Sequence, residues 1–483
     1  MSFESLPASH EPSPGPGGGL RHNYLSFIED TAQTLGLMAP TGTLGIILPL
    51  LIAKGGNTAW ITFLITLIAF SLVLFCVYRF SEHYASSGAI ASFAGAGLGR
   101  RVGIVTGWSY VGAMAFGAAG AAPSTAYYAD LFITQITGAP GSILRGVLIT
   151  GAVIAVAALV AYRDIKLSTK VMLAIELSSL TVVVGILAFA MFHYSAWIDR
   201  PQLHLDGARL PGFQYALVFG FMTLAGFESV TALGSESSRP RRTIPKVLLS
   251  CLIPVGLLYL AAIYCLVAVA RKNGMLFDQL NAPFDTLART LHLGALGYLS
   301  SVGIALSYFA CTLGSVNAGS RVLYSMARKR EFAASFGIAH AVNATPHRGI
   351  LLISGFGIVL PISLLLWRVS LADCVNYLTQ LASYGFIASY FLVCLALPFY
   401  LRKRNILRRS DALMSGAALL ILGIVLALSV FPVPDAPWRY LPYIFFAFVL
   451  GGVCASWRYQ RASAALRGEA GQAAQPKEIS TLV

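Results

Sequence analysis

The sequence predicts an all-α polytopic membrane protein with about twelve transmembrane helices. Its 483 residues are 57% hydrophobic and only 11% charged, with a mean hydropathy of +0.72, and this composition would leave a soluble globule without a polar surface. Apolar windows of roughly 20 residues, enough to cross about 30 Å of hydrocarbon, recur along almost the whole chain. The predicted spans are residues 31–53, 58–79, 102–131, 143–162, 170–192, 213–234, 247–270, 296–326, 349–367, 371–401, 412–431 and 439–457.

The two ends of the chain differ in composition from the predicted transmembrane domain, residues 28–457. Residues 1–27 begin with a stretch rich in Pro, Gly and Ser that lacks the apolar core of a cleaved signal peptide. Residues 458–483 also lack the apolar content needed to fold. We therefore expect one transmembrane domain between two disordered tails.

Basic residues indicate how the chain is oriented. Most of the 34 Lys and Arg residues, Arg321 among them, fall on the connections that share a side with both tails. By the positive-inside rule, both tails are predicted to be cytoplasmic, in a plasma or inner membrane. The net charge of +14 is spread over many short loops, which argues against nucleic-acid binding.

The cysteines and histidines predict neither a metal site nor a catalytic one. All seven cysteines fall in apolar spans without a CxxC pair, as expected for small buried hydrophobic residues. All eight histidines lie in tails, loops or span ends, so no histidine-based triad is expected in the membrane. We expect a protein that is not an enzyme and needs no cofactor.

Two acidic residues stand out by their position. Of the twenty Asp and Glu residues, only Glu176 and Glu228 fall well inside a predicted span. A charge at that depth costs several kcal/mol, so each acid needs a partner, a water-filled cavity or a proton. Two interpretations remain open for each: a hydrogen-bonded residue that holds helices together, or a site for substrate, ion or proton.

The predicted first and sixth spans carry signals of an interrupted helix. The first reads LMAPTGTLGIILPLL (37–51), with two prolines and two glycines within ten residues, and the sixth places Gly226, Glu228 and Ser229 within LAGFES (224–229). Irregular backbone at membrane depth is tolerated where it lines a cavity or is buried in protein. Interruptions at corresponding positions in two sets of five spans are typical of an inverted-repeat secondary transporter, whose half-helix ends bind charged substrate groups. The expected ligand is zwitterionic or carries an amine.

Three sequence segments carry a family resemblance. They are GFESVTALGSESSRPRRTIPKVLL (226–249), SRVLYSMARKREF (320–332) followed by TPHRGI (345–350), and SSGAIASFAGAGLGRRVGIVTGWSY (86–110). In this order they resemble the amino acid permease branch of the amino acid, polyamine and organocation (APC) transporter superfamily, and the likeness runs from about Ile28 to Trp457. The resemblance implies a five-plus-five inverted repeat with discontinuous helices 1 and 6, two additional helices, and alternating access to a central site.

The resemblance also implies roles for individual residues. In the first span, backbone amides of a loop would bind a substrate carboxylate. The loop residues are Pro40, Thr41, Gly42, Thr43, Leu44 and Gly45. This chain departs from the family pattern here, because it has PTGTLG where many relatives have a GxGIG-like run. In the sixth span, backbone carbonyls of Leu224, Ala225 and Phe227 would accept from the amine beside Gly226, Glu228 and Ser229, with the Phe227 ring over the substrate side chain. Tyr110, Tyr308 and Asn317 are candidates to line the cavity, with helix packing as the alternative role.

Glu176 departs from the family pattern. It lies in STKVMLAIELSSL (168–180), at a position where many sodium-independent relatives carry a lysine thought to replace a sodium ion. An acid here would take a proton or pair with a cationic substrate, so Glu176 and Glu228 are the candidate coupling sites, and proton coupling or exchange is favoured over sodium.

The sequence therefore predicts a secondary active transporter of amino acids, with a small-molecule substrate, the lipid bilayer and protons as partners. One alternative is a transporter of polyamines or organic amines. An alternative of another class is a receptor or channel that senses amines on the same scaffold.

Overall fold

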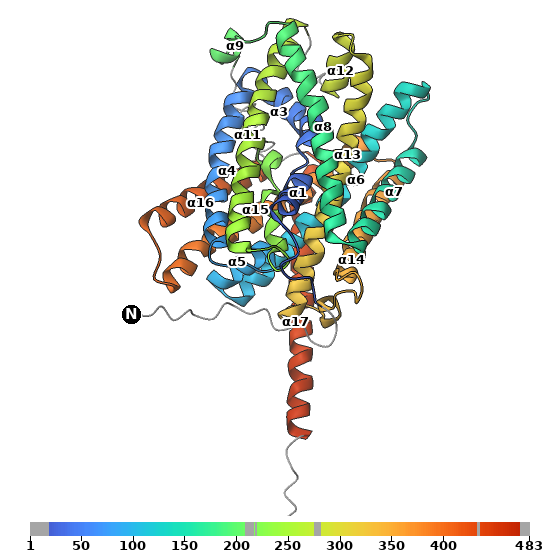
Figure 1. Cartoon of the computed structure of the whole chain (residues 1–483). Coiled ribbons are helices and arrows are strands. Elements are labelled where there is room, and N and C mark those ends of the chain that lie inside the picture. Colours follow the sequence, from blue (N-terminus) through green and yellow to red (C-terminus); the bar gives the residue numbers. More distant parts are fainter. Residues whose placement is uncertain (1–18, 208–216, 218–219, 275–281, 432–434, 474–483) are drawn as a thin grey trace, which may run out of the picture.

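The computed structural model describes residues 19–207, 217, 220–274, 282–431 and 435–473. Within these residues the chain is almost entirely helical, and its only β-type pairing is an isolated bridge between Leu25 and Ser237. The predicted all-α polytopic fold is confirmed (Figure 1). Residues 1–18 and 474–483 of the predicted tails, and 213–216 with 218–219 of the sixth span, lie outside the described residues.

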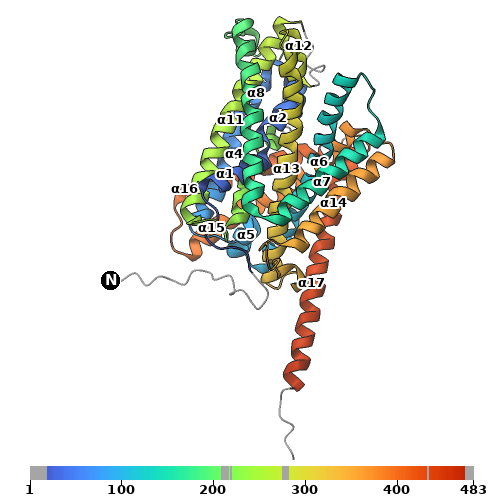
Figure 2. The ribbon, with the colours of Figure 1, turned by 45° about the vertical axis from the view of Figure 1, so that its right-hand side comes forward.

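Ten helices in the described part of the chain are long and apolar enough to cross a membrane. They cover ten of the twelve predicted spans, and the first of them begins at Ile47, within the predicted first span; that span and the sixth carry the interruption signals. The ten helices are α4 (Ala59–Ser81), α6 (Arg100–Thr137), α7 (Ile143–Arg163), α8 (Ile165–His193), α11 (Pro240–Lys272), α13 (Gly294–Arg328), α14 (His347–Leu366), α15 (Leu371–Lys403), α16 (Arg409–Val430) and α17 (Leu441–Ala473). Helix α17 continues past Trp457 into the predicted C-terminal tail, and it projects from the bundle in both views (Figures 1 and 2).

The first span is divided into α1 (Phe27–Met38), α2 (Pro40–Gly45) and α3 (Ile47–Gly55). Ala39 ends α1 in the left-handed conformation (φ 43°, ψ 62°), with its N–H donating to the Leu35 carbonyl. Pro40 has no N–H with which to continue the α1 hydrogen-bond ladder, and it begins α2. Ile46 (φ −120°, ψ −53°) then separates α2 from α3. The interruption predicted from the local density of proline and glycine is thus present.

The sixth span is interrupted at a glycine. Helical residues 220–224 end before Gly226, and the chain continues as the 3-10 helix η2 (Phe227–Leu233). Gly226 has a φ of 95°, a conformation that residues with a side chain rarely adopt. A Cβ built on Gly226 would lie 3.0 Å from Leu37 Cγ, so the two interruptions face each other.

The interrupted segments lie inside a scaffold of continuous helices. Helix α1 contacts α8, α11, α13 and η2, and it lies within the bundle in both views (Figures 1 and 2). Helix α6 packs along both α13 and α15. At Gly385 of α15, an added Cβ would lie 2.7 Å from the Ser109 carbonyl and the Ala113 nitrogen of α6. This close backbone approach fixes the helices that surround the two interruptions.

Candidate functional site

Glu228 is buried at the interruption of the sixth span and is bound by Tyr390 of α15. The Tyr390 hydroxyl donates to Glu228 Oε2 and accepts from the Gly226 N–H at 3.1 Å. The side chain of Glu228 is 0% exposed, and Tyr110 of α6 lies beside the same carboxylate. One tyrosine therefore binds one oxygen of the acid and the backbone amide that the interruption leaves without a helical partner, while Glu228 Oε1 has no hydrogen-bond partner within the described chain.

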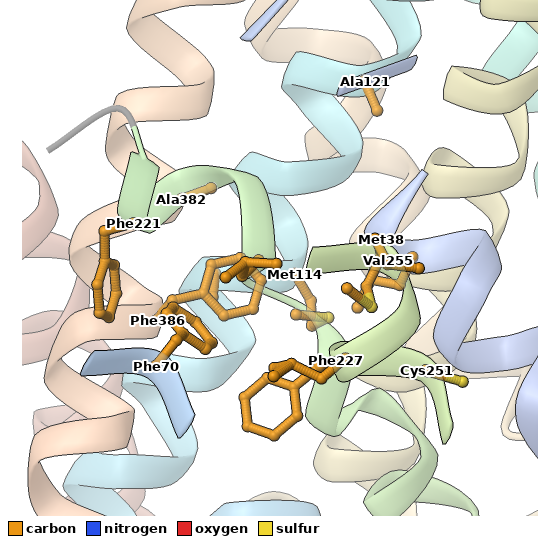
Figure 3. Close-up of a cluster of buried hydrophobic side chains, with 14 of the residues drawn as sticks. Met38, Phe70, Met114, Ala121, Phe221, Phe227, Cys251, Val255, Ala382 and Phe386 are labelled. Carbon is orange, nitrogen blue, oxygen red and sulfur yellow. The ribbon is translucent and has the colours of Figure 1, made fainter. Parts of the chain in front are cut away.

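Phe227 points into a cluster of buried rings. Its ring centroid lies 5.5 Å from that of Phe70 in an edge-on arrangement and 5.8 Å from that of Tyr390. Figure 3 shows Phe227 with Phe70 and Phe386 in one cluster of buried hydrophobic side chains. These contacts fix the start of η2 against α4 and α15.

Glu176 is buried at the other interruption. The Ser307 hydroxyl of α13 donates to Glu176 Oε1 at 2.6 Å and accepts from the Gly42 N–H of α2 at 2.9 Å. Thr41 also lies beside this carboxylate, and Glu176 as a residue is only 1% exposed. A carboxylate of the chain itself is therefore linked through one hydroxyl to the amide end of α2. The Gly42 amide, predicted to bind a substrate carboxylate, here donates to Ser307.

A cavity of about 290 Å³ lies beside both interruptions. Residues of α1–α3, α6, α13 and α15, together with Met222 and Ala225, form its walls, and it extends to Lys54 and to Trp438 in η5 (Trp438–Tyr440). Figure 3 shows its lining residues Met38, Ala121 and Phe386. No acidic residue of the described chain lines it, and most of its wall is apolar with a few hydroxyl and amide groups.

Three of the residues predicted for the site line this cavity, namely Thr43, Ala225 and Tyr308. Glu176 and Glu228 lie behind the cavity wall, each in its own hydrogen-bond arrangement. Asn317 lies further along α13, where its carbonyl accepts from Arg321 at 3.1 Å. The other predicted residues that do not line the cavity are Pro40, Thr41, Gly42, Leu44, Gly45, Leu224, Gly226, Phe227, Ser229 and Tyr110.

Sequence reasoning missed the polar face of α15. Asn376, Thr379 and Gln380 line the cavity, followed by Phe386 a further turn and a half along the helix. Residues spaced three and four apart share one face of a helix. Polar residues at that spacing in an otherwise apolar span were a signal that could have identified this wall.

A buried ion pair closes the bundle on the side of the tails. Arg321 of α13 is 0% exposed, and its Nε and Nη2 lie 2.5 Å and 3.1 Å from the Glu236 carboxylate. Backbone N–H groups of Tyr24 and Leu25 donate to the Glu236 carbonyl, and the Ser237 hydroxyl donates to Asp30 at 2.5 Å. The segment before α1, the end of the sixth span and α13 are thus joined.

Two features of this closure were not predicted from the sequence. Asp30 and Glu236 are buried as deeply as Glu176, although only Glu176 and Glu228 were placed well inside spans. Arg321 is the internal partner of a buried acid and not one of the exposed basic residues that follow a span. Both acids lie near predicted span ends, and only tertiary packing buries them.

No group of three or more His, Cys, Asp or Glu residues in the described chain is arranged to hold a metal ion. The site instead consists of two interrupted helices meeting beside a largely apolar cavity within a polytopic bundle. This is the architecture of a membrane transporter.

Comparison with known proteins identifies the family. The family model described as Amino acid permease matches residues 31–453, so the chain belongs to that family of membrane transporters. It is 26% identical over 388 residues to the uncharacterized amino acid permease YecA of Bacillus subtilis (strain 168), covering 79% of this chain and 86% of the relative.

Two further relatives have more specific names. The chain is 25% identical over 403 residues to the methylthioribose transporter of Bacillus subtilis (strain 168), covering 79% of this chain and 81% of the relative. It is 28% identical over 196 residues to the serine/threonine exchanger SteT of the same organism, covering 40% of this chain and 42% of that protein. The named substrates of these relatives differ, so the family alone does not define the substrate.

Proposed function

We propose that this protein is a secondary active transporter that moves amino acids across a plasma or inner membrane by alternating access. The observation that carries the proposal is the meeting of the two interruptions, Gly226 against Leu37, beside a cavity large enough for a small solute. Interrupted helices at membrane depth expose amides and carbonyls that bind charged groups of a substrate. Membership of the amino acid permease family supports the same assignment.

The substrate binds between the two interruptions. Ala39 and Thr43 present the first interruption to the cavity, and Ala225 presents the second. Amides of the loop after Pro40, with Thr43 nearest the cavity, bind the carboxylate, and carbonyls near the helix end at 224–227 accept from the amine. Because Gly42 donates to Ser307 and Thr43 donates to the Ala39 carbonyl in this arrangement, carboxylate binding requires a rearrangement of these hydrogen bonds.

The arrangement in this structure corresponds to a conformation that is open away from the tails. The cavity extends toward Lys54 near the end of α3, while the pair between Glu236 and Arg321 closes the opposite side. With cytoplasmic tails, as the basic residues predict, this is the outward-facing conformation. Opening the other side then requires separation of the segments that this ion pair joins.

Glu176 is the proposed coupling site. It is linked through Ser307 to the amide end of α2, so a change in its proton occupancy alters the hydrogen bonding of the substrate-binding interruption. Proton symport and exchange both use such a link, and protons are the proposed coupling ion. Because Glu176 and Glu228 are acidic, the sequence was also compatible with a polyamine transporter. Neither acid lines the cavity, and this favours a substrate without additional cationic groups.

A thermal-shift screen of the purified protein tests this function, because a ligand selective for the folded state raises the apparent stability. The panel contains common amino acids, their methyl esters, the corresponding decarboxylated amines and polyamines. We expect stabilisation by one or more amino acids, with loss of the effect when the carboxylate is esterified. Stabilisation only by amines without a carboxylate would contradict the proposed site and favour an amine carrier.

A further inference from the structure

A second cavity, of about 300 Å³, lies where α5 (Ala89–Leu98), the start of α6 and the end of α13 meet. It shares no lining residue with the central cavity. In both views α5 lies at the end of the bundle from which α17 projects (Figures 1 and 2). This is the side carrying the tails, so the cavity lies close to one membrane surface and is distinct from the central cavity.

Two hydrogen-bond donors at the end of α13, Ser325 and the C-cap residue Lys329, line this cavity together with Met326. Lys329 Nζ donates to the Ser92 hydroxyl at 2.5 Å, and no carboxylate of the described residues lies within ion-pair distance of Lys329. Ser325, one turn earlier on the same face, is 1% exposed, and its hydroxyl has no hydrogen-bond partner within the described chain. A buried hydroxyl without a partner is uncommon and requires an explanation.

The opposite wall favours an anion as well. Gly88, Ala91 and Ser92, at the beginning of α5, line the cavity. The Gly88 N–H donates to the Ser86 hydroxyl and the Ser92 N–H to the Gly88 carbonyl, which leaves Ala91 among these three with an amide in the first turn of α5, where the positive end of the helix dipole attracts negative charge. The small side chains of this wall allow a ligand to approach the backbone closely.

Arg100 adds a second cation at the mouth of the cavity. Its side chain is 52% exposed and donates to the Arg330 carbonyl at 2.7 Å. Glu331 is the acidic residue that lines this cavity, and its carboxylate lies 4.0 Å from Arg100 Nε, too far for a hydrogen bond. Lys329 and Arg100 are the charged neighbours of Glu331, so an anion in this cavity competes with that carboxylate for both cations, whereas the Ser325 hydroxyl has no partner within the described chain.

We propose that this cavity is a binding site for a phosphate-bearing anion, held by Lys329, Ser325 and the amide end of α5. The same chemistry fits the headgroup of an anionic lipid and a free phosphate. The position on the side of the tails, predicted to be cytoplasmic, is where anionic lipids are concentrated.

The test uses the full-length protein and two probes. Native mass spectrometry measures retention of phosphatidylglycerol relative to phosphatidylcholine, and thermal unfolding in detergent measures stabilisation by sodium phosphate relative to sodium chloride at equal ionic strength. The variants are Ser325→Ala and Lys329→Gln. The matched control is Arg402→Gln, which removes an exposed cation near the end of α15 that does not line the cavity.

We expect phosphatidylglycerol to bind the wild type and the control variant with equal affinity. It should bind each cavity variant about tenfold more weakly, because each variant loses one hydrogen bond to a charged group. Stabilisation by phosphate without selective lipid retention, lost in the same variants, would identify a soluble phosphate as the ligand. Equal binding of both probes to all variants, or no selective binding at all, would overturn the proposal. If a variant unfolds, Lys329→Arg and Ser325→Thr, which keep the donors, must restore both folding and binding.

Discussion

The buried pair of Glu236 and Arg321 makes a quantitative prediction about stability. The guanidinium contacts both carboxylate oxygens, at 2.5 Å and 3.1 Å, and the two side chains are 1% and 0% exposed. Removing one partner leaves the other charge buried, which costs about 3–5 kcal/mol. Glu236→Gln and Arg321→Met should each lower the free energy of unfolding by this amount. The double variant leaves neither charge of this pair unpartnered and should lose less than either single variant.

Unfolding in mixed micelles with increasing dodecyl sulfate, followed by circular dichroism, measures these differences. The control is Arg289→Met, which breaks a pair with Asp285 in which the arginine is 57% exposed. Such exposed pairs contribute less than about 1 kcal/mol. Single variants that unfold like the wild type, or a double variant that loses the sum of both single losses, would refute the assignment of a coupled closing pair.

The remaining predictions concern the two interruptions. Glu228→Gln keeps an acceptor for Tyr390, so the fold should persist, but loss of the carboxylate beside the Gly226 interruption should lower the transport rate by about tenfold or more, and normal transport would leave Glu228 a structural residue. Glu176→Gln should abolish the dependence of uptake on a pH gradient but preserve counterflow, and unchanged pH dependence would leave Glu176 a structural residue. Gly226→Ala should cost about 1–3 kcal/mol because φ is 95° there. Gly185→Ala on α8, with open space around it, should cause no loss in the same unfolding measurement.

The interruptions were predictable because their causes are local. Pro40 removes a backbone donor, and Gly226 permits a left-handed conformation, so both act within a few residues of the chain. The continuous spans were predictable for the same reason, since a window of about 20 apolar residues is a local property. The first interruption nevertheless begins at Ala39, one residue before the prolines and glycines that signalled it.

The surroundings of the two deep acids were not predictable, because their partners are distant in sequence. Tyr390 lies 162 residues from Glu228, and Ser307 lies 131 residues from Glu176. Without knowledge of which helix faces are adjacent, an acid inside a span can only be recognised as needing a partner. That Glu176 is linked to α2, and that neither acid lines the cavity, are results of tertiary packing.

Arg321 shows a related difficulty. Arg321 lies near a predicted span end and is followed by further basic residues, so it fits the positive-inside pattern as well as those residues do. Only the packing of the end of the sixth span against α13 makes it the partner of Glu236. The polar face of α15 differs, since its spacing was visible in the sequence but its orientation toward the cavity was not.

The central claim is that substrate carboxylate and amine are recognised at the two interruptions of one carrier. Counterflow of radiolabelled amino acids into proteoliposomes preloaded with unlabelled amino acid tests it most directly. We predict saturable counterflow that is competed by free amino acids and not by their methyl esters or decarboxylated amines. Flux that neither saturates nor requires internal substrate would indicate a channel, and counterflow competed equally well by carboxylate-free amines would contradict the account.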